Sequence, residues 1–312
     1  MNNTSPYLHA DTPMPTTRPV LPFDPAQCEA QYNLRQRHPD FYAVLADWQV
    51  RSAQTRADLV VETDLPYGES DDERLDLFPA ASAGAPVVLF IHGGYWQSGD
   101  KRDVSFLARH LVAAGIAVAI NHYGLAPAHS LDTMVAQTRR AVEWLHHYAD
   151  RYGIDRQRIH LMGHSAGAHL AAMMLTEHGP QGSTPAAASL KSVISISGLF
   201  DLTPLLHTSL NRALQLDAEQ AARLSPALLD RWSAAPLYTI VGEDETDAFR
   251  EQAGWIDAHW DAVHAWPLVP GKHHYTALDI FKDPSDPWLA RILDLVLERH
   301  SGLSALSRQH PA

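Results

Sequence analysis

The sequence predicts an α/β fold in which a mostly parallel central sheet is flanked by helices. Short β-branched apolar runs alternate along the chain with longer segments of helical spacing, the pattern of βαβ units. Two of the runs, residues 86–91 and 159–162, lead directly into glycine-containing turns. Parallel strands end at one edge of a sheet, so we expect the chemistry of the chain at that edge.

The predicted elements follow one another in this alternation. Residues 1–25 are rich in Pro, Thr and Asn and are expected to be a flexible lead, whereas 27–57 has helical spacing. Residues 58–63 and 74–78 are expected to form an antiparallel opening pair. Further strands are predicted over residues 86–91, 117–120, 159–162, 191–196, 236–241 and 265–269. Helices are predicted over residues 104–114, 131–152 and 287–300, and directly after the turn at 163–167.

Residues 203–229 interrupt the alternation with short helical pieces over 210–215 and 217–223. We interpret this insertion as a small cap over the active site that restricts substrate size; a peripheral helix pair is the alternative. The chain has 312 residues, of which 46% are hydrophobic, enough to bury one large core. Residues 26–312 are therefore expected to form a single domain.

Composition narrows the classes of partner. A net charge of -12 disfavours a nucleic-acid surface or an anionic-membrane anchor, and no run approaches the roughly 20 apolar residues of a membrane span. The lone Cys28 forms no intramolecular disulfide, and with no H-E-x-x-H motif neither a metal nor a cofactor is expected. The start of the chain lacks a secretory pattern, so a cytoplasmic location is expected; a homodimer remains open.

The stretch Gly163-His164-Ser165-Ala166-Gly167 is a G-x-S-x-G motif between an apolar strand and an alanine-rich helix. A sharp strand-to-helix turn around a serine needs glycines on both sides, because side chains there would collide. Such a turn exposes the serine Oγ. The motif therefore predicts a nucleophile elbow with Ser165 as the nucleophile.

A second turn, His92-Gly93-Gly94-Tyr95-Trp96, follows the strand predicted at 86–91. Glycines let the backbone approach an oxyanion, so we expect the N–H groups of Gly94, Tyr95 and Ala166 to form an oxyanion hole. His92 is expected to hold the loop by hydrogen bonds. Trp96 and His164 are candidate substrate-pocket residues, although Tyr95 and Trp96 fit equally as core aromatics.

An elbow serine needs a base and an acid later in the chain. Four carboxylates follow the strand at 236–241, and the residues alone leave Glu245, Asp244 and Asp247 open as the acid. Of the adjacent His273 and His274, only one can point into the site, and we select His274. Asp201 also follows a strand, but we expect it to cap or brace its turn.

Several motifs in order along the chain resemble the kynurenine formamidase (arylformamidase) type of HGGxW serine hydrolase, within the α/β-hydrolase superfamily. They are Gln31-Tyr32-Asn33-Leu34-Arg35, Tyr67-Gly68, the HGGYW loop, the elbow, Ser197-Gly198-Leu199-Phe200-Asp201-Leu202 and the terminal His274. The resemblance extends from about residue 28 to about residue 298. It implies an α/β-hydrolase fold with Ser165 as nucleophile, His274 as base and Glu245 as acid. The acid assignment follows a pattern matched by Gly242, Glu245 and Phe249.

The predicted enzyme is a serine hydrolase that cleaves a small-molecule amide or ester through an acyl-enzyme. The resemblance implies N-formylkynurenine or a related N-formyl aromatic amine as substrate, and hence tryptophan catabolism. A carboxylesterase acting on small or aromatic esters is the alternative. A catalytically silent binding protein of the same fold is a remote alternative, since it would have no need for the serine, the oxyanion loop and the histidine together.

Overall fold

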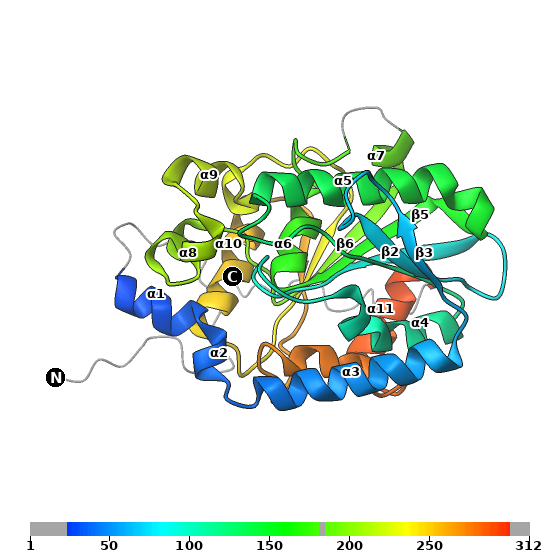
Figure 1. Cartoon of the computed structure of the whole chain (residues 1–312), viewed down its shortest axis with the longest axis horizontal. Coiled ribbons are helices and arrows are strands. Elements are labelled where there is room, and N and C mark those ends of the chain that lie inside the picture. Colours follow the sequence, from blue (N-terminus) through cyan, green and yellow to red (C-terminus); the bar gives the residue numbers. More distant parts are fainter. Residues whose placement is uncertain (1–23, 181–184, 300–312) are drawn as a thin grey trace, which may run out of the picture.

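The computed structural model describes residues 24–180 and 185–299, which form an eight-stranded sheet with helices on both faces (Figure 1). The strand order is β1-β2-β4-β3-β5-β6-β7-β8, and all pairs except β1·β2 and β2·β4 are parallel. The predicted mostly parallel sheet is thereby confirmed. The strands are β1 Glu62–Pro66, β2 Arg74–Phe78, β3 Ala85–Ile91, β4 Ala117–Asn121, β5 Ile154–His164, β6 Leu190–Ile196, β7 Leu237–Ile240 and β8 Val263–Ala265.

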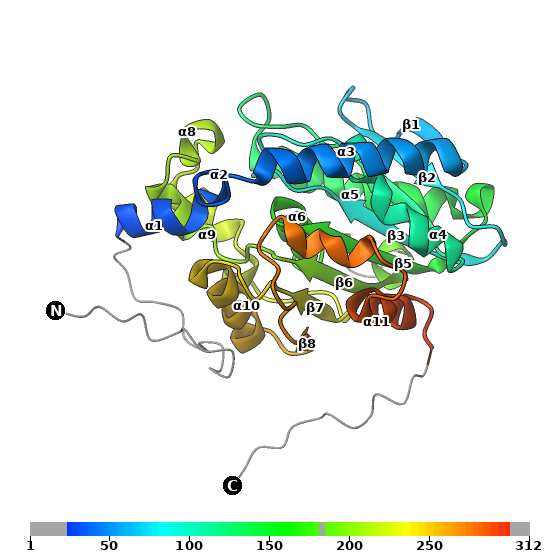
Figure 2. The same ribbon diagram turned by 90° about the horizontal axis from the view of Figure 1, so that it is seen from below.

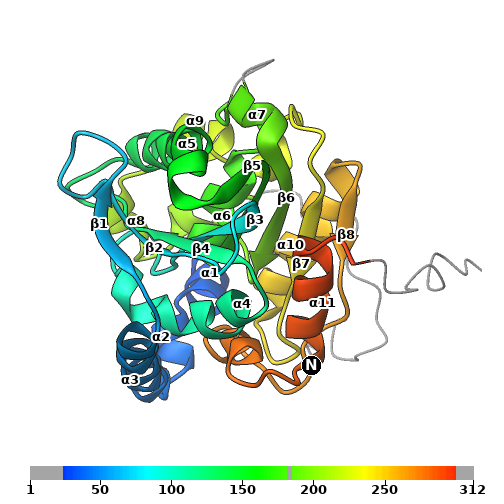
Figure 3. The same ribbon diagram turned by 90° about the vertical axis from the view of Figure 1, so that its right-hand side faces the viewer.

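The central strands are apolar along their whole length because both of their faces are covered. Every residue of β3 and β4 is buried, as expected for a parallel sheet with a helix layer on each side. Figure 3 shows α5 (Leu131–Tyr148) on one face of the twisted sheet, with α4 (Ala108–Ala113) and α11 (Pro287–Val296) on the other. The core therefore lies in two layers, one on each side of β3, β4 and β5.

The segment predicted as one helical stretch over 27–57 consists of three helices. They are α1 (Pro25–Tyr32), α2 (Leu34–Arg37) and α3 (Phe41–Asp58). The last break has a local cause, since Pro39 disfavours helical geometry at His38, whose ψ of 88° is not helical. Figure 2 shows α3 crossing one side of the molecule, while α1 and α2 lie at the end nearer to α8 and α10.

Other observed boundaries differ from the predicted ones because a neighbouring element extends into the expected range. The strand expected at 58–63 begins at Glu62, since α3 continues to Asp58. The strand expected at 265–269 lies earlier, as β8, and Val269 forms only an isolated bridge with Gly242. The helix expected over 104–114 is a 3-10 helix, η1 (Lys101–Leu107), followed by α4. The helix expected over 131–152 ends as α5, with η2 (Ala149–Tyr152) after it, and the last helix, expected over 287–300, ends at Val296. Residues 1–23, with most of the expected flexible lead, and 300–312 lie outside the described residues.

The insertion at 203–229 is helical, as predicted, with η3 (Thr203–His207), α8 (Asn211–Leu214), α9 (Ala218–Arg223) and η4 (Pro226–Leu228). It packs beside the first helix of the chain: the Glu29 carboxylate accepts hydrogen bonds from the Ser209 N–H at 2.7 Å and its hydroxyl at 2.6 Å. The remaining elements are α6 (Ala166–Met173), α7 (Pro185–Ser189), α10 (Asp247–His259) and η5 (Thr276–Phe281). Across residues 24–180 and 185–299, no helix combines the length and the hydropathy needed to cross a membrane.

Candidate active site

Ser165 occupies a strained turn between β5, which ends at His164, and α6, which begins at Ala166. Its backbone has φ 55° and ψ -120°, a conformation that L residues rarely adopt and that surrounding structure must enforce. A Cβ at Gly163 would collide with the backbone of Gly167, and one at Gly167 would collide with the Ile91 carbonyl oxygen. The two glycines are therefore required by space, and the predicted elbow geometry is present.

The loop after β3 lies against this elbow. A Cβ on Gly93 would come within 2.9 Å of the His164 carbonyl oxygen and 3.1 Å of the Ser165 Cβ, so glycine permits this close approach. Gly94 and Tyr95 have φ 118° and 51°, which turns the loop around the serine. Within the described chain, no protein acceptor takes the N–H of Gly94 or of Tyr95. With Ala166 at the start of α6, these groups can receive a developing negative charge.

His92 holds the loop from behind, as the sequence predicted. Its Nδ1–H donates to the Gly93 carbonyl at 2.8 Å, which leaves Nε2 to accept from Nδ1 of His122 at 3.2 Å. The ring also stacks on Tyr123 with 4.5 Å between centroids. Burial lowers the pKa of His92 to about 4, so the imidazole is neutral at physiological pH and does not carry the proton of the reaction.

The structure separates the candidate acids. Nδ1 of His274 lies 3.2 Å from Oε2 of Glu245, and the two side chains are 2% and 0% exposed. Asp244 is exposed, and Asp247 pairs with Arg250 at 2.5 Å. Among these three carboxylates, Glu245 alone contacts the imidazole, the arrangement that fixes a histidine tautomer and stabilises its charged form.

The backbone of His274 is tied to the elbow itself. Nε2 of His164 donates to the His274 carbonyl at 2.8 Å. Burial, followed by the nearby His274, lowers the pKa of His164 to about 3, so His164 is neutral and acts through this one donated bond. The Phe249 ring packs 4.5 Å from the His274 ring and limits its rotation. The His274 side chain is thus held by the Glu245 carboxylate, by its own backbone and by a neighbouring ring.

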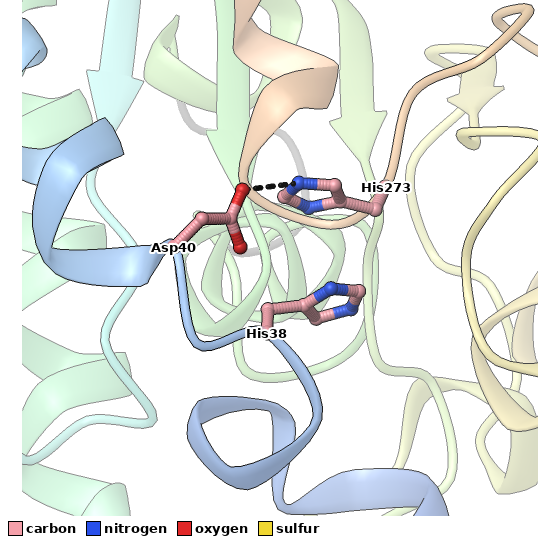
Figure 4. Close-up of side chains that lie close together, drawn as sticks. All are labelled: His38, Asp40 and His273. Carbon is pink, nitrogen blue, oxygen red and sulfur yellow. Dashed lines mark hydrogen bonds and ion pairs between the residues drawn. The ribbon is translucent and has the colours of Figure 1, made fainter.

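His273 points away from this centre. Its Nε2 lies 3.1 Å from Oδ2 of Asp40, and its ring stacks on His38 at 4.2 Å with 16° between the planes (Figure 4). Among the described residues, these three side chains form the group with metal-ligating atoms close together, within 4.8 Å. A zinc ion needs in-plane nitrogen lone pairs that converge at about 2.0–2.1 Å. Stacked rings direct their lone pairs nearly parallel, so this arrangement fits an imidazole pair with its carboxylate better than a metal centre.

A cavity of about 220 Å³ opens onto Ser165, His274 and the HGG loop. Its opposite walls come from α3, with Phe41, Leu45 and Trp48. None of the described residues that line the cavity belongs to the insertion at 203–229. The N-terminal helices supply the wall that was expected from this insertion. Long-range contacts of this kind leave no signal in the local sequence, which is why the wall was missed.

The two candidate pocket residues have different places in the structure. His164 lines the cavity beside the serine. Trp96 does not: it is 0% exposed and packs edge-on against His169 with 5.1 Å between centroids. Its neighbour Tyr95 lines the cavity and donates its hydroxyl to the Tyr32 carbonyl. Asp201 caps its own turn as expected, accepting from the Thr203 N–H at 2.9 Å.

Comparison with known proteins agrees with this geometry. The family described as BD-FAE matches residues 75–236, a little over half of the chain. Kynurenine formamidase of Danio rerio is 36% identical over 214 residues, which cover 65% of this chain and 71% of that protein. Isoprenylcysteine alpha-carbonyl methylesterase of Arabidopsis thaliana is 32% identical over 161 residues, covering 49% of this chain and 38% of that protein.

A solved structure extends the similarity to nearly the whole fold. A candidate thioesterase of Silicibacter sp. tm1040 is 32% identical, with a TM-score of 0.77 and coverage of 85% of this chain and 98% of that one. Sequence and structure neighbours are thus hydrolases of one fold, and the protein is an α/β-hydrolase enzyme with a small-molecule substrate. The chain belongs to the BD-FAE family of the α/β-hydrolases and, within it, to the kynurenine formamidase-like HGGxW serine hydrolases.

Proposed function

We propose that this enzyme is an arylformamidase-type serine hydrolase in which Ser165 is the nucleophile, His274 the base and Glu245 the acid. The observation that carries the proposal is the buried Glu245–His274 pair at 3.2 Å, in one cavity with a strained serine and a loop whose Gly94 and Tyr95 N–H groups have no acceptor among the described residues. These are the parts that acyl transfer requires: an activated nucleophile, an oriented base and donors for an oxyanion.

The proposed mechanism gives each of these groups one role. His274 takes the proton of Ser165 as Oγ attacks the carbonyl carbon, and Glu245 stabilises the imidazolium that forms. The N–H groups of Gly94, Tyr95 and Ala166 stabilise the oxyanion. His274 then returns the proton to the leaving amine, which departs and leaves an acyl-serine. Water, deprotonated by His274, attacks the acyl-serine and releases the acid and the free enzyme.

The substrate proposal is N-formylkynurenine or a related N-formyl aromatic amine. A cavity of about 220 Å³ is smaller than the roughly 300–1,000 Å³ of typical ligand pockets, which favours a small acyl group. Its α3 wall carries Phe41 and Trp48, which suits an aromatic leaving group. The relative from Danio rerio is named a kynurenine formamidase, which supports the same substrate class.

A carboxylesterase is the second candidate, favoured by the methylesterase relative from Arabidopsis thaliana. The same serine, base and oxyanion donors would cleave an ester, whose alkoxide or phenoxide leaves without needing the arylamine pocket. The two proposals differ in the acyl group and in the leaving group. A paired assay therefore separates them.

The test is to measure kcat/KM for N-formyl-L-kynurenine and for 4-nitrophenyl acetate, with purified Ser165→Ala as the blank. We expect formamide turnover to exceed ester turnover and to disappear in the blank. Ester turnover without formamide turnover would reject the arylformamidase in favour of the esterase. Full activity of Ser165→Ala on both substrates would reject the assigned nucleophile.

We further propose that the chain from residue 26 onward forms one domain and that the enzyme works in the cytoplasm. The continuous hydrophobic core, which reaches from Cys28 in α1 to Val296 in α11, supports the single domain. The free, buried Cys28 suits a reducing compartment. Analytical ultracentrifugation would decide whether the enzyme is a monomer or a homodimer.

A further inference from the structure

Arg35, at the end of the Gln31–Arg35 motif, lies at the mouth of the cavity. It is exposed, belongs to α2 and is among the residues that line the cavity. Nη2 donates to the Ser98 hydroxyl at 2.7 Å, and the guanidinium lies 5.2 Å from the centre of the Phe41 ring. These two contacts hold the charge over the opening rather than leaving it free in solvent.

Within residues 24–180 and 185–299, the charge of Arg35 has no partner of opposite sign. Among the described lining residues it is the sole lysine or arginine, and no carboxylate in residues 24–180 and 185–299 pairs with it. The two acidic lining residues are engaged elsewhere: Asp100 binds Arg102 at 2.8 Å, and Asp103 accepts from Gln49 at 3.0 Å. An unpaired guanidinium with free donors at the rim of an apolar cavity is a recognition group for a carboxylate.

Arg35 is also connected to the reacting groups. The Ser98 hydroxyl that it contacts donates in turn to the Gly94 carbonyl at 3.1 Å, in the oxyanion loop. On the other side, burial raises the pKa of Tyr275 above its ordinary value and the Arg35 charge opposes that rise, so the cation acts on the residue next to His274. A ligand carboxylate at Arg35 would therefore lie in the same cavity as Ser165, which the apolar α3 residues Phe41 and Trp48 also line.

We propose that Arg35 binds the carboxylate of the leaving group and selects N-formyl arylamines that carry an amino-acid head group over neutral ones. The inference rests on the proposed function, since it assumes that the arylamine lies along Phe41 and Trp48 with its formyl group at Ser165. Arg35 is thus a specificity-determining residue and takes no part in bond making.

The test compares two substrates that differ in the head group alone: N-formyl-L-kynurenine, and N-formyl-2-aminoacetophenone, which lacks the amino-acid part. The variants are Arg35→Gln, Arg35→Lys and, as matched control, Arg37→Gln, since Arg37 is exposed on the same helix but does not line the cavity. We expect the ratio of the two kcat/KM values to fall about tenfold in Arg35→Gln, mainly through KM, as for one lost charge-assisted contact. Arg35→Lys should keep the ratio within about threefold, and Arg37→Gln should leave it unchanged.

Binding of the leaving groups, measured by calorimetry, tests the same proposal without turnover. L-Kynurenine should bind more tightly than 2-aminoacetophenone to Ser165→Ala protein, and adding Arg35→Gln should remove the difference. Equal losses on both substrates in Arg35→Gln, or equal binding of the two amines to Ser165→Ala protein, would overturn the assignment of Arg35. If neither formamide is hydrolysed by the wild type, the proposed function fails, while the binding measurement still decides whether Arg35 recognises a carboxylate.

Discussion

Replacing Glu245 by glutamine should greatly reduce the turnover rate while leaving the fold intact. The substitution keeps the size of the side chain and an oxygen acceptor, but it removes the negative charge beside His274. That charge matters most when the imidazole has accepted the serine proton, in the transition state and the tetrahedral intermediate. We therefore expect kcat to fall while KM stays nearly constant.

The size of the loss follows from the burial of the pair. Nδ1 and Oε2 are 3.2 Å apart and the side chains are 2% and 0% exposed, so water screens them poorly. Two unit charges about 4 Å apart interact by about 4 kcal/mol at an effective dielectric constant of about 20. Each 1.36 kcal/mol is a factor of ten in rate, which gives a loss of about 1,000-fold. A glutamine that presents its NH₂ group would also favour the wrong imidazole tautomer and extend the loss toward about 10,000-fold.

The assay is steady-state hydrolysis of the preferred substrate by Glu245→Gln, with Asp244→Asn and Asp247→Asn as matched controls. Both controls remove a carboxylate from the same loop, but one is exposed and the other pairs with Arg250, so each should stay within about twofold of the wild type. Thermal unfolding of all three proteins checks that they fold. Wild-type kcat in Glu245→Gln, or a loss of similar size in either control, would refute the assignment of the acid.

Three further outcomes follow from other contacts. Gly93→Ala places a Cβ 2.9 Å from the His164 carbonyl oxygen, so it should separate the oxyanion loop from Ser165 and lower kcat about 100-fold or more; unchanged kinetics would contradict this packing. The pKa of His164 is about 3 in the folded protein and about 6.5 in the unfolded chain. Between about pH 6.5 and 3 the unfolded chain therefore binds a proton at His164 that the folded protein does not, and the free energy of unfolding falls as the pH is lowered. Over this pH range, His164→Gln should reduce the slope of the unfolding free energy against pH by up to about 1.4 kcal/mol per pH unit. The same slope in the variant and the wild type would contradict the lowered pKa of His164. Gln252→Leu removes a buried side chain that accepts from two backbone N–H groups at 2.7 Å. The free energy of unfolding, measured in urea, should fall by about 2–5 kcal/mol, and a change below about 0.5 kcal/mol would contradict those hydrogen bonds.

The fold could be predicted from the sequence wherever a local pattern is sufficient. The strand β3 and the elbow at Ser165 are short apolar runs that end at glycines, and both lie where expected. The helix α10 was not predicted, because its start at Asp247 lies within a run of acidic residues that is typical of a loop. Its stability comes from the side packed on the core, with Phe249 and Trp255, which is a tertiary effect.

In the candidate site, too, residues with a local sequence pattern could be predicted and residues that depend on tertiary contacts could not. Ser165 and the HGG loop were found because their backbone conformations demand particular residues. The acid could not be separated from Asp244 and Asp247 by sequence, since one position along a loop decides whether a carboxylate is buried or exposed. Arg35 belongs to a motif of the family resemblance, but the sequence assigned it no role. Its contact with Ser98 joins residues 63 positions apart, which a local pattern does not reveal.

The hydrogen bonds between the first helices and the rest of the molecule bear on how this enzyme is synthesised. Gln252 donates to the Tyr32 hydroxyl across 220 positions at 2.9 Å, and the Ala248 N–H donates to Gln31 across 217 positions. A ribosome releases α1 and α2 long before α10 exists, so these helices remain without their α10 partners until late in synthesis, and Arg35 on α2 takes its place at the cavity late. Nascent chains that have emerged as far as residue 246 should therefore contain seven of the eight strands, β1 to β7, and the serine elbow, yet bind no substrate. The candidate nucleophile would thus be in place before the cavity that surrounds it is complete.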